Sequence, residues 1–218
     1  MPDPSPIEAS PTTVVFVRHA HTHNPREVIY ARLPRFRLSL DGREAADRTA
    51  RYLADWPIAA IYTSPLLRAR QTAARIAALH PGVPVHQSSW LMEVRTAWEG
   101  DPLALYDQVQ NFTFYNPKGS MGGESIWQVF ARMDRAMRMV LHRHPGQTTV
   151  CVSHGDPIKM LYLVHSGITL TPQAVKVQDP PRAGLVIFRF QNAEEPPAIE
   201  TFDPETGKSH DFGKVPTG

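Results

Sequence analysis

An arginine and a histidine, Arg18 and His19, directly follow a short apolar run in this sequence. The run covers residues 14–17 and consists of apolar, mostly β-branched residues, which is typical of a buried strand. In open α/β sheets, ligands bind at the carboxyl ends of the strands. A guanidinium held beside an imidazole could bind a phosphoryl group while a ring nitrogen attacks it. The pair therefore predicts phosphoryl-transfer chemistry at the end of the first strand.

Two later strand-to-helix junctions resemble each other. Each places a good N-cap residue, Ser64 or Asp156, before a proline at the expected first helical position. Helix N-termini at the carboxyl edge of a sheet are natural anion-binding sites. We therefore expect three segments to direct polar groups into one crevice: Arg18-His19, residues 64–68 and Ser153-His154-Gly155.

Strand-like and helix-like patterns alternate along the chain. The strand patterns cover residues 13–17, 59–63, 83–86, 148–152 and 184–190. The helical patterns cover residues 43–56, 66–80, 124–144 and 157–165, and the third has the clearest apolar stripe. This alternation predicts an α/β fold, a three-layer sandwich with a central, mostly parallel sheet.

The composition suggests where the domain begins and ends along the chain. Residues 1–11 are rich in Pro and Ser and lack the basic start and apolar stretch of a secretory signal, so we expect a disordered leader. Residues 12–190 are expected to form one domain. Residues 90–123 carry aromatics among Gly, Pro and Asn, and are expected to form a lid inserted over the crevice. Residues 191–218 are expected to form a tail that packs on the domain or extends it, with one strand at 198–202.

Charge and cysteine content limit the partners of the protein. The net charge of +2, with arginines spread along the chain, argues against nucleic acid. No run is long and apolar enough to span a membrane. The single cysteine, Cys151, excludes an internal disulfide, and we expect a cytoplasmic protein. The sequence leaves the oligomeric state open, a homodimer included.

Six short motifs follow one another in a recognisable order. They are Arg18-His19-Ala20, Ser64-Pro65-Leu66-Leu67-Arg68-Ala69-Arg70-Gln71-Thr72-Ala73, Leu91-Met92-Glu93, Trp98-Glu99-Gly100, Gly123-Glu124-Ser125 and Ser153-His154-Gly155. Each motif alone is a weak signal. Together, from about residue 13 to residue 190, they resemble the histidine phosphatase superfamily, the phosphoglycerate mutase-like proteins.

The resemblance implies a role for each of five side chains. His19 would be the nucleophile that becomes phosphohistidine, with Arg18 and Arg68 as phosphate clamps. His154 would be a further donor to the phosphoryl oxygens. Glu93 would be the general acid for the leaving oxygen and then the base for water. Because phosphoryl transfer needs mainly positioning and electrostatics, these groups could act without a metal or another cofactor.

The sequence also departs from the family pattern. The nucleophile is followed by Ala20-His21-Thr22, where the family usually has Gly, then Glu or Gln, then Thr. Asn24 stands five residues after the nucleophile rather than six. Thr22 and Asn24 are therefore weaker candidates for phosphate contacts. Arg32 and Arg35 fall where the family often has a loop that borders the site, and could bind a second anionic group of the substrate.

Three alternatives stay open beside a metal-independent phosphomonoesterase that acts on a small phosphorylated metabolite. The pattern His19-x-His21-x-His23 has metal-ligand types, although the barrel that begins this way needs about 250 residues. A phosphoglycerate mutase-type isomerase would use the same residues, but the short stretch after Glu93 favours a hydrolase. A non-catalytic, phosphoprotein-binding relative would also keep the fold.

Overall fold

A six-stranded sheet forms the centre of the computed structural model, which describes residues 10–105, 123–192 and 195–213. Its strands are β1 (Thr12–Arg18), β2 (Ile58–Thr63), β3 (Val85–Gln87), β4 (Thr148–Ser153), β5 (Leu185–Phe190) and β6 (Ala198–Phe202). The order across the sheet is β3-β2-β4-β1-β5-β6. The first four of these strands are parallel, whereas β5 runs antiparallel to β1 and β6 antiparallel to β5. The predicted mostly parallel sheet is therefore confirmed.

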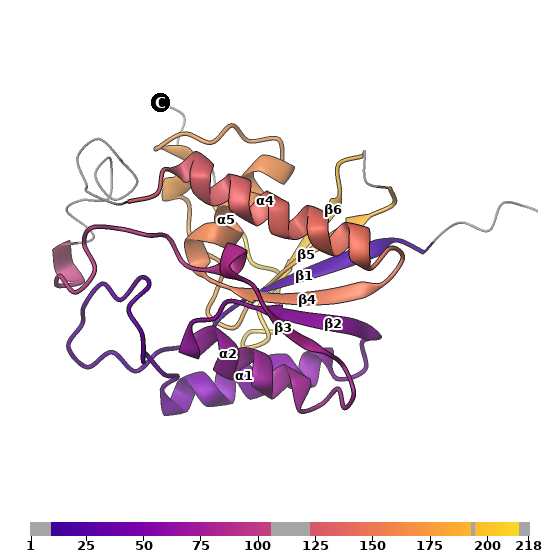
Figure 1. Cartoon of the computed structure of the whole chain (residues 1–218), viewed down its shortest axis with the longest axis horizontal. Coiled ribbons are helices and arrows are strands. Elements are labelled where there is room, and N and C mark those ends of the chain that lie inside the picture. The colour runs from indigo at the N-terminus through magenta and orange to yellow at the C-terminus, as the bar shows by residue number, and fades with distance from the viewer. Residues whose placement is uncertain (1–9, 106–122, 193–194, 214–218) are drawn as a thin grey trace, which may run out of the picture.

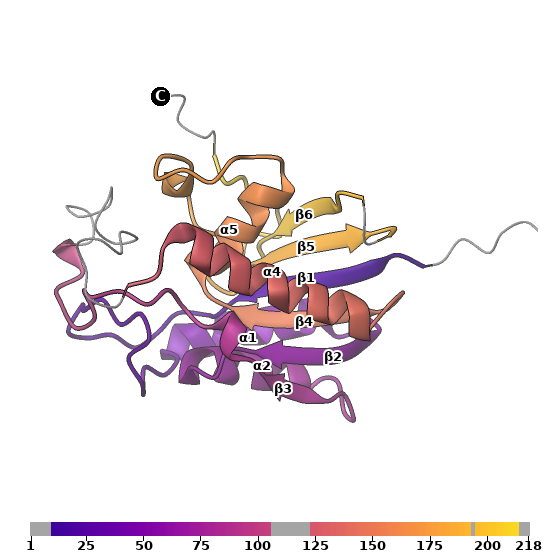
Figure 2. The same ribbon diagram turned by 45° about the horizontal axis from the view of Figure 1, so that its top comes forward.

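Helices cover both faces of this sheet (Figure 1). The helices α1 (Leu40–Leu53) and α2 (Leu67–Ala77) lie on one face, and α4 (Ile126–Arg143) and α5 (Gly155–His165) lie on the other. Short 3-10 helices, η1 (Ser89–Leu91) and η2 (Ala174–Lys176), stand in the connections. The view in Figure 2 shows the same three layers, so the predicted sandwich is confirmed.

The central strand β1 shows why the predicted strand is apolar on both sides. Val15 and Val17 pack into a core cluster with residues of α1 and α2, whereas Val14 and Phe16 pack into a second cluster with residues of α4 and α5. All four side chains are 0% exposed. A strand buried on both faces loses the alternation of polar and apolar residues. Because helices cover both faces, a functional site is expected at the ends of the strands rather than on a face of the sheet.

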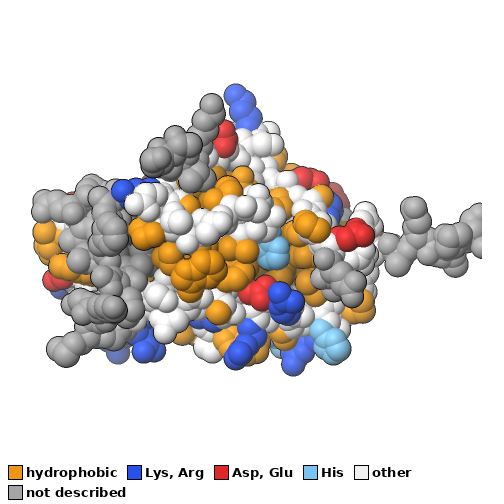
Figure 3. Space-filling model, turned by 90° about the horizontal axis from the view of Figure 1, so that it is seen from above, with side chains coloured by type: hydrophobic (Ala, Val, Ile, Leu, Met, Phe, Trp, Pro, Cys, Tyr) orange, Lys and Arg blue, Asp and Glu red, His pale blue; other side chains and the backbone are white. Residues whose placement is uncertain are grey.

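The helix α4 is amphipathic, in agreement with its predicted apolar stripe. Val129, Met133 and Val140 are buried in the core at 0% exposure. On the outer side, Trp127 is 52% exposed and its ring meets Phe130 edge-on. Figure 3 views this side of the molecule and shows hydrophobic side chains gathered on it.

Two helix starts differ from the sequence prediction. The helix α2 begins at Leu67 with Leu66 at the N-cap, so Ser64 lies before the helix; its hydroxyl oxygen accepts from the backbone N–H of Leu66 and contacts His154. The helix α5 begins at Gly155 with His154 at the N-cap, and Asp156 lies in the first turn, where it pairs with Lys159. The Ser64 side chain thus makes a tertiary contact at the carboxyl edge of the sheet, whereas the Asp156 side chain pairs within its own helix.

The chain after residue 191 continues the fold. The strand β6 pairs with β5, and beyond it Phe212 is 1% exposed and stacks on Tyr162 of α5 at 3.9 Å between ring centroids. The expected leader falls mostly, and the middle of the expected lid (106–122) entirely, outside the described residues. Among the helices described, none combines the length and the apolar character needed to cross a membrane.

A glycine in α1 fixes the loop that follows the first strand. A Cβ on Gly42 would lie 2.0 Å from the carbonyl oxygen of His21. The same carbonyl accepts a hydrogen bond from the backbone N–H of Ser39, the N-cap of α1, at 3.0 Å. Only glycine allows this close approach between helix and loop.

We therefore expect Gly42→Ala to destabilise the protein, because either the helix or the loop must move. Overpacking of this kind costs typically about 1–3 kcal/mol in the free energy of unfolding. In a chain of this size each kcal/mol lowers Tm by roughly 2–4 °C. The measurement is thermal unfolding followed by circular dichroism, with Glu44→Ala, an exposed position of the same helix, as the control. Equal Tm values for the two variants would contradict the prediction.

Candidate active site

His19 lies at the carboxyl end of β1, is 2% exposed, and its hydrogen bonds define its tautomer. Its Nδ1 is 2.8 Å from the carbonyl oxygen of Ala20, which can only accept, so Nδ1 carries the proton. Its Nε2 accepts a hydrogen bond from Arg68 Nε at 3.1 Å. Burial, and then the charge of Arg68, hold the pKa of His19 well below its usual range. The ring is therefore neutral at pH 7, with a lone pair on Nε2.

Arg68 is fixed beside this lone pair from the first turn of α2. The residue is 0% exposed. Its Nη2 donates to the carbonyl oxygen of Ala31 at 2.6 Å, and its guanidinium lies over the Tyr30 ring, 4.7 Å from the centroid. Three contacts thus hold the charge in place before any ligand binds, which is the preorganisation that electrostatic catalysis needs.

His154 stands across from His19, with 5.0 Å between the ring centroids, and is 0% exposed. Its Nε2 is 2.8 Å from Ser64 Oγ, and among the described residues the proton of this hydroxyl has no other acceptor, because its one further hydrogen bond is accepted from the backbone N–H of Leu66. We infer that the Ser64 hydroxyl donates to Nε2, which places the His154 proton on Nδ1. That buried Nδ1 makes no hydrogen bond among the described residues, so it is free to donate to a ligand.

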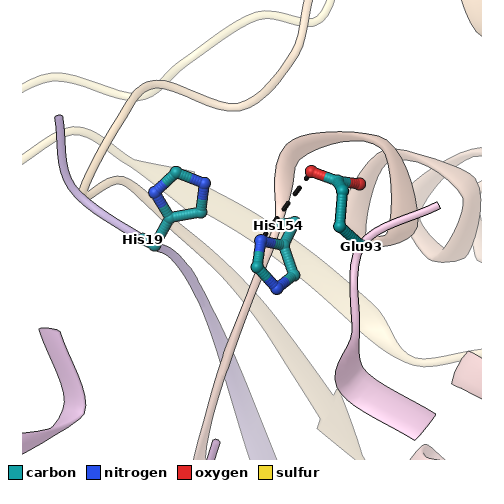
Figure 4. A group of neighbouring side chains, drawn as sticks. All are labelled: His19, Glu93 and His154. Carbon is teal, nitrogen blue, oxygen red and sulfur yellow. Dashed lines mark ion pairs between the residues drawn. The ribbon is translucent and has the colours of Figure 1, made fainter. Parts of the chain in front are cut away.

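Glu93 follows η1 and faces both histidines (Figure 4). One carboxylate oxygen accepts from the backbone N–H of Val94 at 3.0 Å, and the other lies 3.7 Å from His154 Nδ1. The side chain is 17% exposed. Burial, and then the negative charge of Asp156, raise the pKa of Glu93 to about 7. A carboxyl group with this pKa can give and take a proton near neutral pH.

Arg18 is held by a buried network of charges. Its Nη2 pairs with Asp179 at 3.0 Å, and its Nη1 donates to the carbonyl oxygen of Pro180 at 2.6 Å. Lys159, 4% exposed, pairs with Asp179 at 2.8 Å and with Asp156 at 2.9 Å. Burial opposes the effect, but Arg18 and Lys159 hold the pKa of Asp179 at about 2. A Cβ on Gly155 would lie 2.7 Å from Asp179, so glycine makes room for this network.

The two weaker candidates differ in what their side chains contact. Asn24 bonds through both atoms of its side-chain amide to the backbone of Val28, so its side chain is used within its own loop. Thr22 forms an antiparallel bridge with Leu38, and its buried hydroxyl oxygen has no hydrogen-bond partner among the described residues, so its contact with phosphate stays a prediction.

Arg32 and Arg35, the two arginines that the sequence places beside the site, lie in different surroundings in the structure. Arg32 donates to the Glu93 carbonyl oxygen and pairs with Glu124, both at 2.7 Å, and so supports the Glu93 segment from behind. Arg35 is exposed at a turn with φ of 68°. Neither arginine is among the described residues that line the pocket beside Arg18 and Glu93, and their binding of a second anion stays a prediction.

Three of these side chains also have the types and spacing of metal ligands. One atom each of His19, Glu93 and His154 lies within 4.8 Å of the others. However, the ligand atom of His19 accepts a hydrogen bond from the Arg68 guanidinium, and a fixed positive charge there favours an anion over a cation. The other two histidines of the His-x-His-x-His pattern, His21 and His23, are exposed and do not share this cluster.

The Ser64 contact leads to a prediction about the second histidine. Without the hydroxyl, Nε2 of His154 can carry the proton, and Nδ1 then has none to donate. We expect Ser64→Ala to lower kcat about tenfold, less than the 10²–10³ typical for removing a transition-state donor itself. Steady-state kinetics would show the loss mainly in kcat, and Ser166→Ala, at the far end of α5, serves as control. A change in KM alone would contradict the tautomer assignment.

Fold and site together define a class, the phosphoglycerate mutase-like α/β proteins, and comparison with known sequences gives the family. The chain belongs to the histidine phosphatase superfamily (branch 1), whose sequence model matches residues 14–197. An uncharacterized protein of Mycobacterium tuberculosis is 37% identical over 161 residues, which are 72% of this chain and 79% of that protein. The predicted family is therefore confirmed.

Solved structures agree with this assignment. YhfR of Bacillus stearothermophilus is similar with a TM-score of 0.69 and 27% identity, over 81% of this chain and 90% of that one. A phosphoserine phosphatase of Entamoeba histolytica, solved with 3-phosphoglyceric acid, has a TM-score of 0.68 and 25% identity, over 86% of this chain and 94% of that one.

The sequence reasoning missed Asp179, Lys159 and Arg182. Asp179 and Lys159 hold Arg18, and Arg182 lines the pocket beside it. A signal for Arg182 was present: it stands just before the run at 184–190. If that run is antiparallel to β1, its first residues lie at the edge where β1 ends.

Proposed function

We propose that this protein is a metal-independent phosphomonoesterase that forms a phosphohistidine on His19 and acts on a small phosphorylated metabolite. The observation that carries the proposal is the hydrogen bond from His19 Nδ1 to the Ala20 carbonyl oxygen, which leaves the Nε2 lone pair as a nucleophile. The phosphoserine phosphatase among the similar structures supports the reaction class.

In the first half of the reaction, His19 Nε2 attacks phosphorus, and a P–N bond forms as the bond to the ester oxygen breaks. Arg68, Arg18 and the Nδ1–H of His154 offset the charge on the transferred group, which is the main requirement of phosphoryl transfer. The leaving oxygen takes the proton of Glu93, whose raised pKa of about 7 retains that proton near neutral pH.

In the second half, the Glu93 carboxylate takes a proton from water. The water oxygen attacks phosphorus, the P–N bond breaks, and inorganic phosphate leaves. The positive charge on the phosphorylated ring is stabilised by the Ala20 carbonyl throughout, and His19 returns to its neutral form. The arrangement therefore needs one nucleophile, one proton carrier and three donors.

The experiment is the hydrolysis of p-nitrophenyl phosphate between pH 5 and 8 in the presence of EDTA, with release of inorganic phosphate as the readout. We expect turnover that EDTA does not reduce. Activity that disappears in EDTA and returns with added Zn²⁺ would refute the metal-independent mechanism. Transfer of phosphate between hydroxyl groups of one compound, without release of phosphate, would instead identify an isomerase.

A further inference from the structure

Glu93, the proposed proton carrier, lies on a stretch of chain without regular secondary structure. His19 and His154 directly follow the strands β1 and β4, whose backbone hydrogen bonds hold the chain up to each histidine. Glu93 instead follows the short helix η1, and the described chain from 92 to 96 belongs to no helix or strand. A general acid must stay within hydrogen-bond reach of the leaving oxygen, so other contacts have to hold this backbone in place.

One arginine of α4 binds most of the carbonyl oxygens in this segment. Arg132 Nη1 donates to the carbonyl oxygens of Trp90, at 2.7 Å, and of Met92, at 2.6 Å. Its Nη2 donates to the carbonyl oxygen of Glu93 at 3.1 Å. The two remaining N–H groups, on Nε and Nη2, donate to the Glu124 carboxylate at 3.0 and 3.2 Å. All five donors of this guanidinium are therefore engaged.

Two further side chains complete the set of donors. Ser153, at the end of β4, donates through its hydroxyl to the carbonyl oxygen of Leu91 at 2.8 Å. Arg32 Nε donates to the Glu93 carbonyl oxygen at 2.7 Å, so this oxygen accepts from two arginines. The four successive carbonyl oxygens of residues 90–93 are thus each bound by a side chain from a distant part of the chain.

Glu124 joins the two arginines to each other. Its carboxylate accepts from Arg132 and, at 2.7 Å, from Arg32 Nη2, and the three side chains are between 13% and 18% exposed. It also accepts from the backbone N–H of Arg95 at 2.9 Å. Burial opposes the effect, but the hydrogen bonds and charge of Arg132 hold the pKa of Glu124 below its usual range. Glu124 is therefore an anion at neutral pH that holds both guanidiniums.

These contacts fix the position of the Glu93 carboxyl group relative to the histidines. One carboxylate oxygen binds the backbone N–H of Val94 at 3.0 Å, and the other lies 3.7 Å from His154 Nδ1 (Figure 4). With the backbone held by its carbonyl and the side chain held by Val94, little freedom remains. Misplacement of a reacting group by about 1 Å can cost on the order of 10²-fold in rate.

We propose that Arg132 is a positioning residue for proton transfer by Glu93. With Glu124 and Arg32 it forms a clamp on the backbone that carries this carboxyl group. The inference rests on the proposed phosphatase function, because it assigns the clamp to the acid of that reaction. Arg132 lies 39 residues after Glu93 in the chain and acts on the reaction only through it.

The test compares two esters of similar size that differ in their leaving group. Benzyl phosphate releases an alkoxide that needs the proton of Glu93, whereas p-nitrophenyl phosphate needs little assistance. The ratio of their kcat/KM values, benzyl to p-nitrophenyl, should fall about tenfold in Arg132→Gln, less than in Glu93→Gln, where the acid itself is removed. A role in stability alone would lower both rates equally, and an unchanged ratio would therefore overturn the inference.

A double variant shows whether Arg132 acts through Glu93. In Glu93→Gln the acid is already lost, so adding Arg132→Gln should leave the ratio of the two esters within about twofold of that in Glu93→Gln. A further tenfold fall would mean that Arg132 affects another step, and would contradict a positioning role toward Glu93.

Three single variants separate geometry from charge and from general destabilisation. Arg132→Lys keeps the charge but offers three N–H donors in place of five, so little of the ratio should be recovered, and full recovery would refute the clamp. Arg32→Gln removes one of the two donors to the Glu93 carbonyl and should lower the ratio less than Arg132→Gln does. Arg138→Gln is the matched control. Arg138 lies on the same helix, is 74% exposed and pairs with Asp134, so the ratio should equal that of the wild type.

Hydrogen exchange tests the clamp without turnover. Peptides that cover residues 88–96, followed by mass spectrometry, should exchange faster in Arg132→Gln than in Arg138→Gln, and equal exchange would overturn the clamp. Faster exchange, together with no hydrolysis of either ester by the wild type, would support the clamp and refute the phosphatase. Hydrolysis of both esters with an unchanged ratio in Arg132→Gln would refute the positioning role and leave the phosphatase intact.

Discussion

Replacing His19 with alanine should reduce the hydrolysis of p-nitrophenyl phosphate by at least about 10⁴-fold, the scale seen when a covalent nucleophile is removed. The neighbouring ring of His154 should not take over, because the nitrogen that faces Glu93, Nδ1, carries the proton and its Nε2 contacts Ser64 instead. The substitution also leaves Arg68 without the acceptor at its Nε. The measurement is steady-state release of p-nitrophenol, with thermal unfolding to verify that the variant is folded.

His21→Ala is the matched control for this prediction. His21 lies two residues further along the chain and is exposed, so we expect activity close to that of the wild type. A loss of activity equal to that in His19→Ala would favour the His-x-His-x-His pattern instead. Incubation with a substrate labelled on phosphorus should also leave an acid-labile label on the wild type and none on His19→Ala.

Replacing Glu93 with glutamine should reduce the hydrolysis of alkyl phosphates far more than that of aryl phosphates. An alkoxide is a poor leaving group and needs the proton of Glu93, whereas p-nitrophenolate leaves with little assistance. General acid catalysis contributes typically about 10²–10⁴-fold, and we expect a loss in this range for glycerol 3-phosphate. Equal losses for both kinds of ester would show that Glu93 is not the acid.

The pH dependence gives a second test of the same residue. Because Glu93 must hold a proton to act as the acid, kcat/KM for an alkyl phosphate should fall as the pH rises through about 7, the raised pKa of this carboxyl group. Glu93→Gln should lack that decline. Glu99→Gln is the control. The Glu99 carboxylate accepts from the backbone N–H of Arg32 and is not part of the cluster of His19, Glu93 and His154, so the decline of kcat/KM with rising pH should persist in this variant.

The fold could be predicted from the sequence because most of its information is local. A strand buried on both faces, such as β1, needs an unbroken apolar run, and α4 needs an apolar stripe with helical spacing. The catalytic candidates were predictable for a similar reason. His19, Ser64 and His154 directly follow parallel strands, and parallel strands end at one edge of the sheet.

The remaining parts of the site depend on contacts between distant segments. Ser64 has a good N-cap side chain, but α2 begins at Leu67 and the Ser64 hydroxyl contacts His154, 90 residues later in the chain. Arg32 lies near His19 in the sequence, yet its guanidinium is bound by Glu124, 92 residues later. Arg182 comes from the far end of the domain and reaches the pocket because β5 is antiparallel, a direction that residue patterns do not specify.

The burial of Cys151 has a consequence for how such an enzyme would withstand oxidants. This residue is the one cysteine of the chain, it lies in β4 at 0% exposure, and burial raises the pKa of its thiol far above the usual range. Peroxides and alkylating agents react with accessible thiolates. A phosphatase with an imidazole nucleophile and a single buried thiol would therefore retain its activity under oxidising conditions that inactivate enzymes with a catalytic cysteine.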